Sequence, residues 1–131
     1  MLAASNRRPA DHVWVSGGLS GDVLVIGAVD PDNTNAGRAF VFERDGNGTW
    51  VQTQELSDPT GAAGFAYGFS VSVSGGVIVV GEYGDDDQGV NSGSAFVYER
   101  DTLGTWQQTQ KLLQPGGATD SYFGVSVSIC N

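Results

Sequence analysis

The sequence is poor in the residues that most catalytic and metal sites use. It has one cysteine, Cys130, and one histidine, His12, among its 131 residues. A single cysteine excludes an internal disulfide and a zinc site made of cysteines. Because the only histidine lies outside the patterned part of the chain, no Ser-His-Asp or Cys-His catalytic arrangement can be argued. We therefore expect a protein that is not an enzyme.

Basic residues are also scarce. Six lysines and arginines against fifteen aspartates and glutamates give a formal net charge of -9 and a pI of about 4.1. A protein that binds phosphate backbones or anionic membranes needs the opposite sign, so we expect no nucleic-acid partner. Divalent cations and basic protein surfaces remain compatible with this charge.

Long apolar runs are missing. The longest, Val23–Val29, is too short to span a bilayer, so we expect no membrane insertion by this chain. Residues 1–12 lack the apolar stretch of a signal peptide and are predicted to form an irregular leader. No window shows helical periodicity, which favours an all-β protein.

The sequence does contain a tandem repeat. Residues 38–54 align with residues 94–110 without a gap, at an offset of 56, and twelve of the seventeen positions are identical. The match continues at the same offset from Tyr67–Val73 to Phe123–Ile129. Upstream, residues 21–27 match residues 75–81 at an offset of 54. A fixed period of this length indicates one supersecondary unit per repeat.

Each copy carries four strand patterns separated by turn residues. In the second copy they are Phe69–Ser74, Val77–Tyr83, Ser94–Arg100 and Trp106–Leu113. The continuous apolar run in the second of these predicts a strand that is buried on both faces. The polar stretch Gln107–Lys111 predicts an outer edge strand, with its lysine discouraging edge-to-edge aggregation.

Four strands per unit, repeated radially, is β-propeller geometry. We predict an all-β, partial β-propeller of about two four-stranded antiparallel blades plus one or more extra strands. The leader, 1–12, precedes a first blade repeat at 13–68, a second at 69–123, and the start of a third at 124–131. Closed propellers have roughly four to eight blades. The other blades would come from a longer propeller or from self-assembly, unless the chain is a truncated, non-functional product.

The repeat resembles a known family at its most regular positions. Tyr67–Val71 and Phe123–Val127 resemble the Phe-Gly half of the FG-GAP repeat, while Val25–Ala28 and Val79–Glu82 resemble its Gly-Ala-Pro half without the proline. The resemblance implies the propeller of integrin α-subunits and of related bacterial and algal surface proteins. It therefore implies a location at the cell surface or outside the cell.

A subgroup of this family is closer still. It carries SGSAFVYER and GTWxQTQKL segments, which are found here at Ser92–Arg100 and Gly104–Leu112. Integrin-type repeats often hold calcium in a loop between the first two strands of a blade. Here that connection is only residues 20–22 or 74–76, so the family's calcium site is not expected at these positions.

Acidic loops elsewhere are the candidate metal site. Asp85, Asp86 and Asp87 form the densest acidic cluster, and its counterpart in the first repeat contains Asp30 and Asp32. Ca²⁺ prefers six to eight hard oxygen ligands on a flexible loop. The alternative is a solvated acidic turn in which the aspartates cap backbone NH groups.

For function, we predict a non-catalytic binding or structural module that contacts a protein or a glycan. Trp50 and Trp106, at equivalent positions of the repeat, offer an aromatic platform for a ligand or, as the repetition favours, packing between adjacent blades. The alternative is a fragment of a propeller-based enzyme that acts on polysaccharides through its acidic loops.

Overall fold

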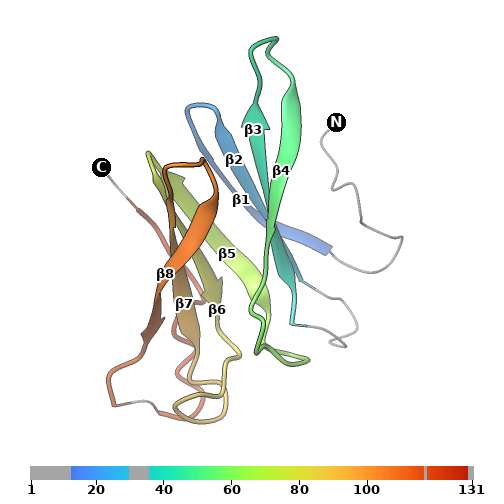
Figure 1. Ribbon diagram of the computed structural model, residues 1–131. Helices are drawn as coiled ribbons and strands as arrows, with labels where there is room; N and C mark the ends of the chain where they lie inside the picture. Colours follow the sequence, from blue (N-terminus) through green and yellow to red (C-terminus); the bar gives the residue numbers. More distant parts are fainter. Residues whose placement is uncertain (1–12, 30–35, 117, 130–131) are drawn as a thin grey trace.

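The computed structural model describes residues 13–29, 36–116 and 118–129, which form two four-stranded antiparallel sheets (Figure 1). The first sheet, blade 1, has the order β1-β2-β3-β4, and the second, blade 2, has the order β5-β6-β7-β8. The strands are β1 Val13–Ser20, β2 Val23–Val29, β3 Arg38–Arg44, β4 Trp50–Leu56, β5 Tyr67–Ser74, β6 Val77–Glu82, β7 Ser94–Arg100 and β8 Trp106–Leu113. The predicted all-β fold of two propeller blades is confirmed.

Equivalent turns join the strands of the two blades. In each blade an aspartate carboxylate closes the turn between the third and fourth strands. Asp45 Oδ1 accepts hydrogen bonds from the backbone NH groups of residues 47 and 49, and Asp101 Oδ1 accepts them from residues 103 and 105, all at 2.8–3.0 Å. Short aspartate side chains favour such turns. In the described residues there is no helix with the length and apolar character that a membrane crossing requires.

The main core lies between the two blades. Blade 1 contributes Val23 and Val25 of β2, Ala39 and Val41 of β3, and Leu56 of β4. Blade 2 covers this face with residues from all four of its strands: Tyr67, Val71, Val73, Ile78, Val80, Phe96, Tyr98 and Trp106. Trp106 is 2% exposed, so the interpretation of this tryptophan as packing between blades is confirmed.

The prediction that the second strand is buried on both faces is wrong for the second copy. Ile78 and Val80 face blade 1 and are fully buried, whereas Val77 and Val79 on the opposite face are only half-buried. At the equivalent positions of blade 1, Val25 is buried because blade 2 packs over it. In the described residues no complete blade covers the outward face of blade 2.

Glycines allow the two blades to approach closely. A Cβ atom at Gly27 of β2 would collide with the carbonyl oxygen of Gly68 in β5. The same carbonyl accepts a hydrogen bond from Ser16 Oγ at 2.9 Å, and Tyr67 N donates to Ala36 O at 2.6 Å. The Phe-Gly half of one repeat therefore packs against the glycine of the Gly-Ala-Pro half of the repeat before it.

The C-terminal segment repeats these contacts on the outward face of blade 2. Ser70 Oγ donates to Gly124 O at 2.8 Å, and Phe123 N donates to Ser92 O at 3.0 Å. Both bonds lie one repeat after their counterparts at the blade junction. Residues 123–128 thus occupy the place of a third inner strand, although apart from a single bridge at Phe123 they form no regular ladder.

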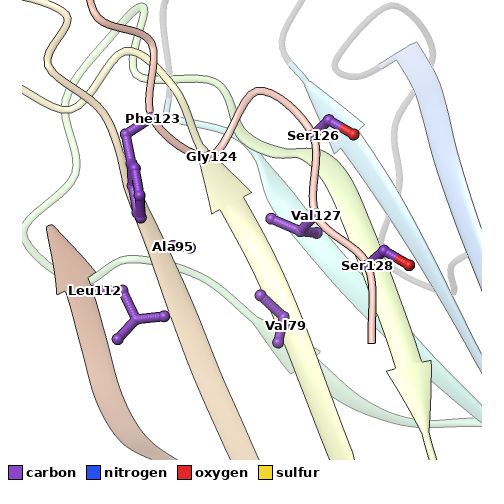
Figure 2. Close-up of a pocket in the computed structure, with 8 residues that line it drawn as sticks. All are labelled: Val79, Ala95, Leu112, Phe123, Gly124, Ser126, Val127 and Ser128. Carbon is purple, nitrogen blue, oxygen red and sulfur yellow. The ribbon is translucent and has the colours of Figure 1, made fainter. Parts of the chain in front are cut away.

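This segment leaves a groove of about 380 Å³ along blade 2. Figure 2 shows Val127 on the side of the segment that faces Val79, while the side chains of Ser126 and Ser128 point the other way. Ala95, Leu112 and Phe123 complete the apolar wall. The groove therefore lies where the apolar face of a following blade would pack.

Candidate functional site

Three carboxyl groups meet in the interior beside the blade junction. Asp58, Glu82 and Asp85 each offer a carboxylate oxygen, and these oxygens lie within 4.8 Å of one another. Glu82 and Asp85 are fully buried, and Asp58 is 8% exposed. We call these three residues the carboxylate centre.

The three residues come from different parts of the fold. Asp58 follows β4 on the segment that leads from blade 1 to blade 2, Glu82 is the last residue of β6, and Asp85 lies in the loop before β7. Glu82 points toward blade 1 because it shares the strand face of Ile78 and Val80. The centre therefore joins a loop of one blade to the second strand of the next.

Asp85 is the best-satisfied member of the centre. Its Oδ2 accepts hydrogen bonds from Ser94 Oγ and from the Lys111 ammonium, both at 2.7 Å, and its Oδ1 accepts one from Asp87 N at 2.8 Å. Although burial opposes ionisation, these donors, Lys111 and Ser94 above all, hold the pKa of the Asp85 carboxyl below its usual value. Asp85 is therefore an anion.

Glu82 has much weaker partners. The single proton of Ser94 Oγ points to Asp85, which leaves the hydroxyl 3.5 Å from Glu82 Oε1. Glu82 Oε2 is buried without a hydrogen-bond partner, and so is Asp58 Oδ2. Burial, followed by the nearby Asp58 carboxyl group and its charge, raises the pKa of Glu82 to about 10.

Two tyrosines close the apolar side of the centre. The hydroxyl groups of Tyr67 and Tyr98 form a short hydrogen bond with each other inside the blade junction. Burial raises the pKa of both phenols, that of Tyr98 to about 12, and the charges of Glu82 and Asp58 contribute in the same direction. Both tyrosines are therefore neutral hydrogen-bonding groups near neutral pH.

The predicted acidic residues do not gather into one site. Asp85 turns inward to the carboxylate centre, whereas Asp86 and Asp87 are exposed. Asp86 Oδ1 accepts a hydrogen bond from Asn91 N, and Asp87 pairs with Lys111 at 2.7 Å. The other two candidates, Asp30 and Asp32, lie outside the described residues.

Sequence reasoning missed Asp58 and Glu82, although a signal for Glu82 was present. At an offset of 54, its counterpart in the first repeat is Ala28. At an offset of 56, the counterpart of Asp58 is Gln114. A charged residue in one copy, at a position that is apolar or uncharged in the other copy, indicates that the two copies differ there in chemistry and not only in side-chain packing.

A second feature lies on the surface of blade 2. Phe69 of β5, Tyr83 after β6 and Tyr122 of the C-terminal segment form a chain of edge-to-face ring contacts, with centroids 4.9 Å and 5.7 Å apart. Phe69 is 37% exposed and Tyr122 is 40% exposed. We call these three residues the aromatic strip.

The Phe-Gly half at Tyr67–Val71 and the buried carboxylate centre lie in one stretch of sequence. Residues 50–98 match the family model described as FG-GAP repeat. The matched stretch begins with β4 of blade 1 and ends within β7 of blade 2. The stretch that matches the FG-GAP repeat model therefore spans the junction between the two blades. No curated protein matches the chain.

All three residues of the carboxylate centre fall inside this FG-GAP match, and so do Phe69 and Tyr83 of the aromatic strip. Tyr122 lies outside it and belongs to the segment that repeats the start of β5. The family match therefore covers the whole carboxylate centre and part of the aromatic strip. It assigns no role to either of them.

Proposed function

We propose that the chain is a non-catalytic binding module, made of FG-GAP-type propeller blades, that contacts a protein or a glycan at a cell surface or outside the cell. The observation that carries this proposal is the aromatic strip. Exposed aromatic side chains that lie together offer a large contact area at a small cost in conformational entropy, and they are enriched in binding surfaces.

The aromatic strip is not required by the repeat. Equivalent positions in the first copy hold Val29 in place of Tyr83 and Ala66 in place of Tyr122. The backbone at both Ala66 and Tyr122 is left-handed, with φ of 60° and 55°. A bulky residue is uncommon in that conformation and costs of order 1–3 kcal/mol. A large exposed ring retained at such a position supports a role in binding.

The two outward blade faces support a further part of the proposal. The outward face of blade 1 carries the buried side chains of Phe40 and Phe42 together with half-buried Leu24, Ile26 and Trp50. These are the first-repeat counterparts of the residues with which blade 2 covers blade 1. We propose that a second copy of the chain packs its blade 2 outward face over the half-buried residues of this set, in a head-to-tail contact.

The alternative, an enzyme that acts on polysaccharides, has one observation in its favour. A carboxyl group with a raised pKa beside an ionised carboxylate is the arrangement that glycoside hydrolysis uses. Glu82 is completely buried, however, and Asp58 is almost so, which leaves no room for a sugar between them. This burial favours the binding module. The family subgroup and the cell-surface location rest on the motif resemblance alone.

A glycan and protein-ligand array, probed with the purified chain, tests the proposal. We expect binding that falls at least about tenfold in Tyr122→Ala and in Tyr83→Ala, since each ring contributes buried contact area. Leu103→Ala is the matched control, because Leu103 is 89% exposed and lies at the far turn of blade 2. Ligand binding that is unchanged in both tyrosine variants, or depolymerisation of a bound polysaccharide, would contradict the proposal.

A further inference from the structure

The carboxylate centre lacks a partner that its chemistry requires. Glu82 Oε2 and Asp58 Oδ2 are both buried, and neither accepts a hydrogen bond. Buried polar atoms in native proteins are nearly always paired, because an unpaired one loses its hydration without compensation. Both residues belong to the carboxylate centre, in which one carboxylate oxygen of each member lies within 4.8 Å of the others. Two unpartnered acceptors in one buried centre point to a positively charged ligand there.

The charge of the centre supports the same conclusion. With all three carboxyl groups ionised, the centre would carry three negative charges, and the Lys111 ammonium, 2.7 Å from Asp85, supplies one positive charge. Two negative charges would then lack a counter-charge in a site from which water is largely excluded, which is expensive, and burial therefore favours the protonated form of Glu82 when no cation is bound. A divalent cation would neutralise them.

The fold itself does not explain the centre. The first repeat builds the same strands with Ala28 in place of Glu82, Phe42 in place of Tyr98 and Glu55 in place of Lys111. The strands of a blade therefore form without the charged and hydroxyl groups that surround this site, although the counterparts Ala28 and Phe42 lie on the outward face of blade 1 and not in a blade junction. The centre belongs to the described junction and is not part of the strand pattern itself.

We propose that Asp58, Glu82 and Asp85 bind a divalent cation between the two blades. The candidate metal ligands are all oxygen atoms, namely those of the three carboxyl groups and Ser94 Oγ, which lies within hydrogen-bonding distance of Asp85. Such a set of ligands favours Ca²⁺ over zinc. The site lies at the end of β6 away from the short turn at residues 75–76. It is therefore different from a site on a loop between the first two strands of a blade.

Binding of the cation would stabilise the contact between blades. Asp58 follows the last strand of blade 1, and Glu82 and Asp85 belong to blade 2, so a shared ion ties the two sheets together. A ligand that binds only the folded chain raises its stability by mass action. The proposal therefore predicts that the thermal stability of the blade pair depends on the divalent cation.

The test is thermal unfolding and calorimetric titration of the full chain after treatment with a chelator, with CaCl₂ as the probe. We expect CaCl₂ at about ten times its Kd to raise Tm by about 5 °C. The shift should vanish in Glu82→Gln, which keeps the shape of the side chain and removes its charge. Asp58→Asn serves as a second variant in case the first fails to fold, and should also lose the shift.

Asp86→Asn is the matched control, because Asp86 belongs to the same acidic run but lies on the surface. It should keep the full Ca²⁺ response. An absence of heat and of any Tm shift with millimolar CaCl₂ would overturn the proposal and leave Glu82 and Asp58 sharing a proton. An equal response in wild type, Glu82→Gln and Asp58→Asn would overturn it too, and would move the cation to the exposed loop.

Discussion

At the scale of single residues, the most unusual position in the blade junction is Glu82. It occupies a strand position that alanine fills in the first repeat, and it is fully buried next to two other carboxyl groups. Its strand neighbours Ile78 and Val80 pack against blade 1, as an apolar face should. The chain therefore places one ionisable group on an otherwise apolar face.

The pH dependence of stability should report this group when divalent cations are absent. The pKa of Glu82 is raised from 4.5 to about 10 in the folded chain, so folding favours its protonated form. Below the unfolded pKa, Glu82 is protonated in both states and does not change the free energy of unfolding. As pH rises from about 4.5 toward 10, Glu82 lowers the free energy of unfolding by a growing amount, on the order of 3 kcal/mol at pH 7. Urea titrations in chelator should show this fall in the free energy of unfolding for wild type.

Glu82→Gln is the reference for that experiment, because an amide does not titrate. As pH rises from 5 to 9, the unfolding free energy of wild type should fall relative to that of the variant. A difference that stays flat across this range would show that Glu82 titrates normally in the folded chain.

A glycine substitution tests the close approach of the blades. Gly27→Ala places a methyl group against the carbonyl oxygen of Gly68, and the backbone around it has little room to move. We expect a loss of about 1–3 kcal/mol in unfolding free energy. Gly46→Ala, at an exposed turn where no atom lies within 4 Å of the added group, should change stability by less than about 0.5 kcal/mol. Equal losses in the two variants would contradict the packing described here.

At the scale of elements, the repeat positions were predictable and their environments were not. The second-copy strands predicted from alternation and turns agree with β5–β8 to within two residues at each end. The edge strand β8 is polar and exposed between Gln107 and Gln110, as its composition predicts. The burial of Val77 and Val79 was overestimated, because an apolar run reports what a strand is suited to pack against and not whether a neighbour is present.

The carboxylate centre was beyond prediction for a related reason. Asp85 was identified from its acidic run, but Asp58 lies 27 residues away on a different blade, and only the packing of the blades brings the two together. Lys111 was assigned to edge protection and instead forms ion pairs with Asp85 and Asp87. Such contacts depend on tertiary register, which a single sequence does not specify.

The two equivalent tryptophans offer a test at this scale. Trp106 at the start of β8 is buried in the blade junction, and its backbone is held by Gln54 of blade 1, whose amide accepts from Trp106 N at 2.9 Å and donates to Trp106 O at 2.7 Å. Trp50 at the start of β4 is only half-buried, on the outward face of blade 1. Trp106→Ala should cost about 3–5 kcal/mol, and Trp50→Ala distinctly less, by denaturant unfolding at low protein concentration. Equal costs would contradict the asymmetry of the two faces.

At the scale of the whole molecule, the described residues form one completed blade junction and two outward blade faces, and on the face of blade 1 Phe40 and Phe42 are already buried while Leu24, Ile26 and Trp50 are half-buried. The outward face of blade 1 presents the counterparts of the residues that blade 2 uses inside the junction, and the outward face of blade 2 presents the counterparts of those that blade 1 uses. Two such faces on one molecule are complementary to each other and not to themselves. Association through them is therefore head-to-tail, and it closes into a ring if the rotation between blades permits.

Charging one face should block this association without disturbing the internal junction. Val79→Asp places a carboxylate in the groove of blade 2, where burial against another chain would leave it unpaired. We expect this variant to be monomeric while keeping its β-sheet circular dichroism. Val51→Asp, on a position of β4 that is 44% exposed, is the control and should associate like wild type. Identical masses for wild type and Val79→Asp would argue against the groove as an interface.

The most direct test of the central claim, that this chain is a pair of propeller blades with two complementary outward faces, is its native mass by size-exclusion chromatography with light scattering. At micromolar concentration we predict a discrete assembly of a few copies that dissociates on dilution. A well-folded monomer whose mass does not change with concentration would contradict the head-to-tail association of the two outward faces.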